Sequence, residues 1–429
     1  MYIIQRVLSK LKSIFKKLIN YLIGERKYIK KNLYPLVFKK RASMLFSDFT
    51  LYFSSSFECR AKILEGCIKN KLKNIVYIYD TPDFTTMRYR VINFLEIINQ
   101  HKDNYKAHLF YTSEIKDIRK YINNDTICIF VRVSWTLELD SFIQFLKLNN
   151  IKVIYDIDDL IFREEDIKFI VSSDYQSKDI NHQNILFGYL YRKIWMMNLA
   201  DVFITTNEFL GLLLNNYFKR RVYVIYNSLN KRQVDFANNI LSKFNQQKQK
   251  TKYIGYFSGS SSHNNDFSLI SDHLVRVLSE FSNVNLVLGG YLQIDHQKFN
   301  NYKKRIIQLS FTDFMTQMLN LSSLYINLIP LILNDFNNSK SELKYFESAI
   351  FKVPSIASPT FVYKQIYERN PNNIVLSQNS EWYQKIKELI LNEDYYRTIS
   401  QSAYEDVINT YTVENILKQI NNFLDEVNI

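Results

Sequence analysis

The sequence predicts an α/β protein with two doubly wound, Rossmann-like domains. Short runs of β-branched and aromatic residues alternate with helical stretches from residue 74 onward, stop at a polar, lysine-rich and glutamine-rich segment at 242–252, and then start again. Runs of this kind are typical of strands that are buried on both faces, as in parallel sheets. The 429 residues also exceed what one ordinary core holds, so at least two domains are expected.

Each domain is expected to contribute one series of strands. The first series is 74–80, 107–112, 126–133, 151–159, 201–206 and 220–230, and the second is 253–259, 284–290, 305–311, 323–331 and 353–358. The predicted parts are a basic amphipathic helix at 1–31, a first α/β domain at 32–230, a linker at 231–252, a second α/β domain at 253–410 and a C-terminal helix at 411–429. Because parallel sheets bind ligands beyond the carboxyl ends of their strands, we expect a cleft between the two domains.

The basic residues are concentrated at one end of the chain. Residues 1–73 carry a net charge of +13, which equals the formal charge of the whole chain. Residues 3–22 have apolar side chains at helical spacing, and the basic residues off that face are Arg6, Lys10, Lys12, Lys16 and Lys17. This pattern predicts a helix on an anionic membrane surface and does not favour nucleic-acid binding. The alternatives are a helix packed on the first domain and an organellar transit peptide.

The cysteines indicate a reducing compartment. Cys59, Cys67 and Cys128 are odd in number and too far apart for a paired metal-ligand motif. No apolar run approaches the ~18 residues of a spanning helix. We therefore expect a cytoplasmic protein that is peripheral on the inner face of the membrane.

A turn of small residues follows the first strand of the second domain. It contains Gly259, Ser260, Ser261 and His263, and a helix is expected to begin just after it. Free backbone N–H groups at such a turn are suited to hold phosphate, although an ordinary capped turn has the same residues. His263 could donate to a phosphate or sugar oxygen, or it could simply face solvent.

Four segments, taken together and in order, resemble a known enzyme family. They are "TMRYRVINFLE" (86–96), "VIYDIDDLIF" (153–162), "IGYFSGSSSHNNDFSLI" (254–270) and "INLIPLILNDFNNSKSELKYFESAIFKVPSIAS" (326–358). The family is that of bacterial glycosyltransferases of the GT-B fold, close to glycosyltransferase family 4 (group 1). The resemblance implies that the second domain binds a nucleoside diphosphate sugar and that the first presents the acceptor.

The resemblance also implies roles for particular residues of the second domain. Glu347 would bind the ribose hydroxyls, Lys344 or Lys340 would face the diphosphate, and the turn at 259–263 would lie under the phosphates. Lys344 and Glu347 are three residues apart and therefore share a helical face, as a plain surface ion pair also would. The family commonly has a further glutamate eight positions before the ribose-binding one, where this chain has Ser339.

Three carboxylates stand at the end of the strand at 151–159, and three interpretations of them compete. Asp156 and Asp158 match a metal-binding DXD motif of single-domain glycosyltransferases. Asp156 also matches the nucleophile of haloacid-dehalogenase-like phosphatases. In the two-domain interpretation, which we favour, Asp158 and Asp159 face the cleft and contact the acceptor or orient Arg88 and Arg90. Of these two arginines, we expect Arg90 to point into the cleft.

The sequence therefore predicts a membrane-associated glycosyltransferase. The expected reaction moves a sugar from a nucleoside diphosphate sugar to a cell-surface glycan or a lipid-linked glycan, with retention and with neither metal nor cofactor. The alternatives are a phosphatase that uses Asp156 and a non-catalytic sugar-binding partner subunit.

Overall fold

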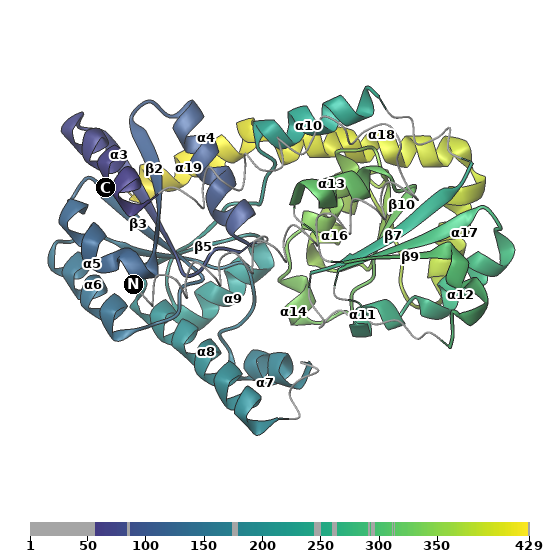
Figure 1. Cartoon of the computed structure of the whole chain (residues 1–429), viewed down its shortest axis with the longest axis horizontal. Helices are drawn as coiled ribbons and strands as arrows, with labels where there is room; N and C mark the ends of the chain where they lie inside the picture. The colour runs from purple at the N-terminus through teal and green to yellow at the C-terminus, as the bar shows by residue number, and fades with distance from the viewer. Residues whose placement is uncertain are drawn as a thin grey trace, which may run out of the picture. The chain divides into compact units, whose positions relative to one another are not determined.

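The computed structural model describes residues 56–427, except for 84–85, 174–178, 244–249, 260–263, 291, 293–296, 311 and 313. The basic helix predicted at 1–31 lies outside the described residues. Residues from Phe57 onward form one compact unit, which contains two parallel sheets. We call the part built on the first sheet the N-lobe and the part built on the second sheet the C-lobe (Figure 1).

The N-lobe sheet has the strand order β2-β1-β3-β4-β5-β6 within the described residues. Every pairing is parallel. The strands are β1 (Lys73–Tyr79), β2 (Tyr105–Tyr111), β3 (Thr126–Val131), β4 (Val153–Asp156), β5 (Val202–Thr205) and β6 (Val222–Val224). All residues of β3, β4 and β5 are buried, because helices cover both faces of the sheet.

Helices connect these strands. The N-lobe helices are α3 (Phe57–Lys69), the π-helix η1 (Arg88–Ile92), α4 (Asn93–His101), η2 (Thr112–Glu114), α5 (Ile115–Ile118), η3 (Arg119–Tyr121), α6 (Leu137–Leu148), α7 (Glu164–Ser173), α8 (Ile180–Leu199) and α9 (Glu208–Phe218). Several begin at a side-chain cap; for example, Asn207 Oδ1 accepts a hydrogen bond from Leu210 N (2.9 Å) at the start of α9.

The C-lobe sheet has the strand order β12-β11-β10-β7-β8-β9 within the described residues. Counted from its own first strand, this is the 3-2-1-4-5-6 class of doubly wound sheet, with a switch point between β7 and β10. The strands are β7 (Lys252–Ser258), β8 (Val284–Gly290), β9 (Ile306–Leu309), β10 (Ile326–Ile329), β11 (Ser355–Ala357) and β12 (Val375–Leu376). The two-sheet GT-B architecture expected from the sequence is confirmed.

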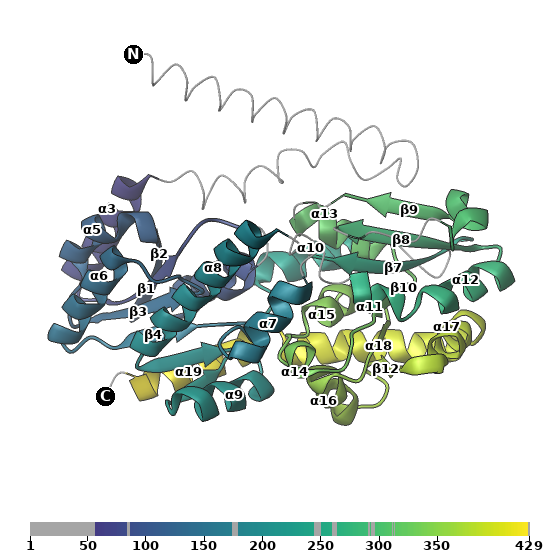
Figure 2. The same ribbon diagram turned by 90° about the horizontal axis from the view of Figure 1, so that it is seen from below.

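Helices lie on both sides of the C-lobe sheet (Figure 2). They are α11 (Asn264–Ser268), α12 (Ser271–Glu280), η6 (Asn300–Arg305), α13 (Phe314–Ser322), α14 (Asp335–Asn338), α15 (Leu343–Ala349), α16 (Phe361–Arg369), η7 (Asn379–Glu381), α17 (Trp382–Leu391) and α18 (Glu393–Thr410). Two apolar clusters, one on each face of the sheet, form the core of this lobe.

Two further helices join the lobes. The segment expected as a linker begins with α10 (Lys231–Leu241), which is capped by Asn230 and packs its Ala237 and Ile240 into the C-lobe core. The C-terminal helix α19 (Val413–Val427) crosses back to the N-lobe, where it contacts α4 (Figure 1). Leu229 precedes α10 and Tyr411 precedes α19, and Leu229 N donates to Tyr411 O (2.8 Å). The two places where the chain passes between the lobes therefore lie next to each other.

Candidate active site

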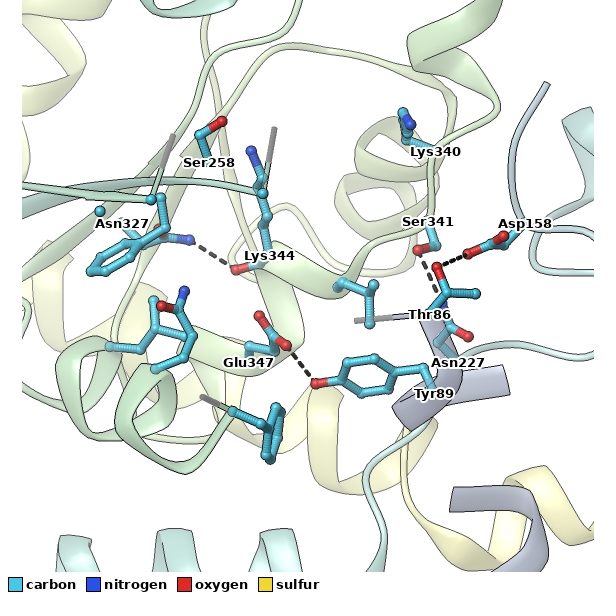
Figure 3. A pocket seen from close by; sticks show the side chains of 18 of the residues that line it. Thr86, Tyr89, Asp158, Asn227, Ser258, Asn327, Lys340, Ser341, Lys344 and Glu347 are labelled. Atoms are coloured by element: carbon cyan, nitrogen blue, oxygen red, sulfur yellow. Dashed lines mark hydrogen bonds between the residues drawn. The ribbon is translucent and has the colours of Figure 1, made fainter. Parts of the chain in front are cut away.

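A cavity of about 350 Å³ lies at the carboxyl ends of both sheets. Loops after β1, β3, β4 and β6 bring N-lobe residues to it, and loops after β7, β8, β9 and β10 bring C-lobe residues. Figure 3 labels ten of the lining side chains: Thr86, Tyr89, Asp158 and Asn227 of the N-lobe, and Ser258, Asn327, Lys340, Ser341, Lys344 and Glu347 of the C-lobe. Arg132 and Asp159 of the N-lobe also line the cavity. The cavity is therefore where doubly wound domains are expected to bind a ligand.

Helix α15 carries Lys344 and Glu347 on the cavity side, as the three-residue spacing predicts. Asn327 Nδ2 fixes this helix by donating to Lys344 O (2.9 Å) and to Ser348 Oγ (3.1 Å). On the opposite face, the Tyr345 hydroxyl donates to Asp406 Oδ2 (3.0 Å), so α15 is held between the sheet and α18.

The ammonium group of Lys344 is buried and has no hydrogen-bond partner among the described residues. It lies 5.0 Å from the centre of the Tyr256 ring. Burial lowers the pKa of Lys344 to about 8, against the opposing effects of the carboxylates of Asp266 and Glu347. A buried cation without a hydrogen-bonded anion is unfavourable, so this side chain is suited to receive a negatively charged ligand.

Glu347 is half-buried and accepts a hydrogen bond through Oε1 from the hydroxyl of Tyr89, an N-lobe residue (Figure 3). Burial raises the pKa of Glu347 to about 7, while the Tyr89 hydrogen bond and the Lys344 charge act in the opposite direction. The second oxygen, Oε2, makes no hydrogen bond to a described residue. It is therefore free to accept a ligand hydroxyl.

On the N-lobe side, Arg132 joins the two predicted acids. Its Nη1 lies 3.2 Å from Asp158 Oδ1, and its Nη2 lies 2.9 Å from Asp159 Oδ2. Thr86 Oγ1 accepts from Arg132 Nη1 (2.8 Å) and donates to Asp158 Oδ2 (3.3 Å). Arg132 follows β3 with φ of 55°, an uncommon conformation for a side-chain-bearing residue. Its carbonyl accepts a hydrogen bond from the buried Lys193.

Contacts between the lobes converge on the segment 339–341. Lys340 Nζ donates to Asp159 Oδ1 (2.6 Å), Asn227 Nδ2 donates to Ser341 Oγ (3.0 Å), and Asn207 Nδ2 donates to Ser339 O (2.9 Å). Asp159 is thus shared between Arg132 and a C-lobe lysine.

The expectation that Arg90 points into the cleft is wrong. Its side chain is fully buried and faces the N-lobe, where Nε and Nη2 donate to Asp156 (3.0 and 2.8 Å) and Nη1 donates to Ile225 O (2.8 Å) and Asn227 Oδ1 (3.1 Å). The reason is a buried carboxylate at the end of β4 that needs a partner. Arg88 is half-buried, with its guanidinium 5.2 Å from the Phe314 ring centre.

The geometry disfavours the two alternative roles of Asp156. Its side chain is 1% exposed, and burial raises its pKa to about 6 even though Arg90 opposes the shift. A nucleophile must reach its substrate, and Asp156 does not line the cavity. Asp158 is engaged by Arg132 and Thr86, and within the part of the chain that the structure describes no acidic, histidine or cysteine cluster has the form of a metal site.

The other predicted residues are placed as follows. Gly259 lines the cavity directly after β7, together with Gly289 and Gly290 from the end of β8. Ser260, Ser261 and His263 lie outside the described residues. The sequence interpretation missed Arg132, Tyr89 and Asn227. A lone arginine at the end of an otherwise apolar strand was the available signal for Arg132, while nothing local marked the other two.

Comparison with known proteins indicates a glycosyltransferase. Residues 273–422, which form most of the C-lobe, match a family model described as "Glycosyl transferase-like". The resemblance to GT-B glycosyltransferases of family 4 is confirmed. A comparison with curated protein sequences finds no match.

Solved structures with the same fold cover most of the chain. HepE from Anabaena, in complex with UDP and glucose, has a TM-score of 0.57 at 13% identity and covers 82% of this chain and 100% of its own. A glycosyltransferase from Rickettsia africae has a TM-score of 0.55 at 14% identity, with coverage of 83% and 98%. Sucrose-phosphate synthase from Thermosynechococcus elongatus has a TM-score of 0.53 at 12% identity, with coverage of 83% and 99%. At these identities the similarity establishes the fold.

Proposed function

We propose that this GT-B glycosyltransferase moves a sugar from a nucleoside diphosphate sugar to a glycan or lipid-linked glycan, in the biosynthesis of a cell-surface polysaccharide such as capsule or lipopolysaccharide. The observation that carries this proposal is the placement of Lys344 and Glu347 on one helix face, in a cavity that Asp158 and Asp159 of the N-lobe also line. The HepE complex, which holds UDP and glucose in the same fold, supports a nucleotide-sugar donor.

The C-lobe residues are suited to a diphosphate leaving group. The unpartnered ammonium of Lys344 would pair with the phosphates, and Oε2 of Glu347 would accept from the ribose hydroxyls. Negative charge grows on the diphosphate as the glycosidic bond breaks, so a positioned cation lowers the energy of the transition state. Lys340 would add a second positive charge once it leaves Asp159.

The N-lobe residues are suited to hold the hydroxyl groups of an acceptor. Asp158 and Asp159 present carboxylate oxygens at the cavity, and Arg132 keeps both in place. In the retaining reaction that the family resemblance implies, the bond from the anomeric carbon to the phosphate oxygen breaks and a bond to the acceptor oxygen forms on the same face. The acceptor proton passes to the departing phosphate oxygen, so no enzymic base is required.

Substitution of Glu347 tests the donor site. Glu347→Gln should weaken UDP binding by about 2 kcal/mol, or about 30-fold, because hydrogen bonds to a charged acceptor are lost. Isothermal titration calorimetry on the full chain measures this change. Glu381→Gln, at an exposed residue of the same lobe, is the matched control and should bind UDP as the unsubstituted protein does. Equal affinities for the two variants would sink the assignment.

Removal of divalent metal tests the source of the positive charge. We propose that Lys344 and Lys340 supply it, so donor hydrolysis and transfer should persist in EDTA at rates within about two-fold of the untreated enzyme. Activity that EDTA abolishes and Mg²⁺ or Mn²⁺ restores would instead favour a metal held by aspartates. A chain that binds UDP but neither transfers nor hydrolyses any donor would be a sugar-binding subunit.

We also propose that the protein acts at the inner face of the cytoplasmic membrane. The support is the charge of +13 carried by residues 1–73, together with the apolar face of 3–22. Among the described residues, no helix has the length and apolar character needed to cross a bilayer.

A further inference from the structure

Tyr89 belongs to the N-lobe by sequence and to the C-lobe by packing. It lies in the π-helix η1, yet its ring is 3% exposed within the apolar cluster formed by α13, α15 and their neighbours. The ring meets Phe346 edge to face at 5.7 Å and Phe314 at 6.0 Å. Among the described residues that line the cavity, Tyr89 therefore joins the N-lobe directly to the core beneath the donor site.

The next residue fixes the direction of Tyr89. Arg90 points the other way, into the N-lobe, where its side chain donates four hydrogen bonds. The wide turn of a π-helix allows neighbouring side chains to be anchored in two different cores, and such turns are frequent at functional sites. Tyr89 is thus supported by rigid contacts in both lobes.

The hydroxyl of Tyr89 donates to Oε1 of Glu347 (Figure 3). A phenol that donates to one carboxylate oxygen restricts rotation of the carboxylate and leaves the other oxygen to accept. Glu347 lies on the cavity wall, and its Oε2 makes no hydrogen bond to a described residue. The orientation of this free oxygen is therefore set by a side chain of the opposite lobe.

We infer that Tyr89 is a positioning residue for nucleoside recognition: its hydroxyl holds the Glu347 carboxylate in the orientation in which Oε2 meets the ribose diol, and so favours ribonucleotides over deoxyribonucleotides. This inference rests on the proposed function. It adds an N-lobe residue to a ribose-binding site that would otherwise consist of C-lobe residues alone. The affinity for the donor would consequently depend on how the lobes are closed.

The test compares UDP with 2′-deoxy-UDP by calorimetry on the full chain. Tyr89→Phe removes one oxygen atom and keeps the ring that packs on Phe346 and Phe314. It should weaken UDP binding by about 10-fold and leave 2′-deoxy-UDP within about two-fold, so that the preference for ribose falls. In a Glu347→Gln background, the same change should have no further effect on the preference.

Tyr345→Phe is the matched control. Tyr345 lies on α15 itself, and this change also removes a part-buried phenol–carboxylate hydrogen bond, the one to Asp406, on the face turned away from the cavity. It should lower the melting temperature about as much as Tyr89→Phe does and leave the ribose preference unchanged. If Tyr89 had a purely structural role, the two variants would have similar melting temperatures and the same ribose preference.

The outcomes separate the inference from the function on which it rests. If Glu347→Gln lowers the ribose preference and Tyr89→Phe does not, the positioning role is overturned while the donor site stands. Tighter UDP binding by Tyr89→Phe would mean that the phenol competes with the ribose, which also overturns the inference. If Glu347→Gln leaves the ribose preference intact, the proposed donor site itself fails.

Discussion

Glu342, at the start of α15, departs from ordinary burial rules. It is 2% exposed, and neither carboxylate oxygen has a hydrogen-bond partner on another described residue. Burial raises its pKa from 4.5 to about 7. The charged and titratable groups around it are Glu208, whose charge adds to this shift, Arg369 and Arg90, which oppose it, and Tyr226, Tyr363 and Tyr411. The protein therefore carries a carboxyl group that is best accommodated in the protonated form.

Glu342 should make the folded state less stable as the pH rises. Its pKa is higher in the folded than in the unfolded chain, so the folded state binds the proton more tightly, and stability falls between pH 4.5 and about 7. Glu342→Gln keeps the shape of the protonated group. It should match the unsubstituted protein at pH 5 and be more stable at pH 8 by on the order of 1–3 kcal/mol in urea denaturation. The exposed Glu381→Gln serves as control, and parallel pH profiles for all three proteins would contradict a raised pKa of Glu342.

Whether the position of a cavity residue could be predicted depends on whether its contacts are local in the sequence. That Lys344 and Glu347 both line the cavity could be predicted, because helical spacing fixes a shared face and the segment resembles a family motif. Arg90 was misplaced because the sequence does not show that Asp156 is buried and needs its charge. Tyr89 was missed because its contact with Glu347 joins residues 258 positions apart. Long-range pairing of this kind leaves no local pattern.

At the scale of elements, the strands were predictable because a parallel sheet buries both faces and therefore needs unbroken apolar runs. The short strand β12, with two residues, leaves no such run and was not predicted. The helix α10 was read as linker, although Asn230 and Gln233 form a capping box at its start. The remaining polar residues of that segment concealed an apolar stripe that enters the C-lobe core.

The end of strand β8 gives an element-scale prediction. Gly290 has φ of 85°, and a Cβ there would lie 1.9 Å from Ser258 O of the neighbouring strand. Gly290→Ala should therefore destabilise the protein by more than about 2 kcal/mol, since both the backbone conformation and the contact are unfavourable. Denaturant unfolding monitored by circular dichroism measures this loss.

A second glycine provides the opposite case. Gly188 is exposed in α8, and a Cβ there would meet nothing within 4 Å. Gly188→Ala should stabilise the protein by about 0.5–1 kcal/mol, because alanine has the higher helix propensity. If Gly290→Ala stabilises the protein, as Gly188→Ala is expected to do, the account of the β8 turn is wrong.

For the whole molecule, the path of the chain ties the two lobes together. After completing the C-lobe it returns along α19, whose Phe423 packs on Tyr223 at 5.2 Å and whose Gln419 accepts a hydrogen bond from Tyr226 N (2.9 Å). The spacing of apolar residues at 413–427 predicts an amphipathic helix, but it does not show which lobe the apolar face contacts. The two crossings lie close together, and at the cavity Tyr89, Lys340 and Asn227 each donate a hydrogen bond from one lobe to the other.

The distribution of charge leads to a prediction for the whole chain. Because residues 1–73 carry the entire surplus of +13, binding to vesicles should require anionic lipid and should weaken with salt, since surface charges are screened over ~10 Å at 0.1 M. Deletion of residues 1–24 should abolish co-sedimentation with such vesicles. It should leave UDP affinity within about two-fold, because the described residues that line the cavity all lie beyond residue 80.

The deletion also discriminates between the two roles that the basic segment could have. Unchanged co-sedimentation of the shortened chain would contradict a membrane role for this segment. A shortened chain that loses its cooperative thermal transition would show that the segment belongs to the N-lobe core. Retained UDP binding with loss of vesicle binding is the expected result, because the basic segment and the residues proposed to bind the donor belong to different parts of the sequence.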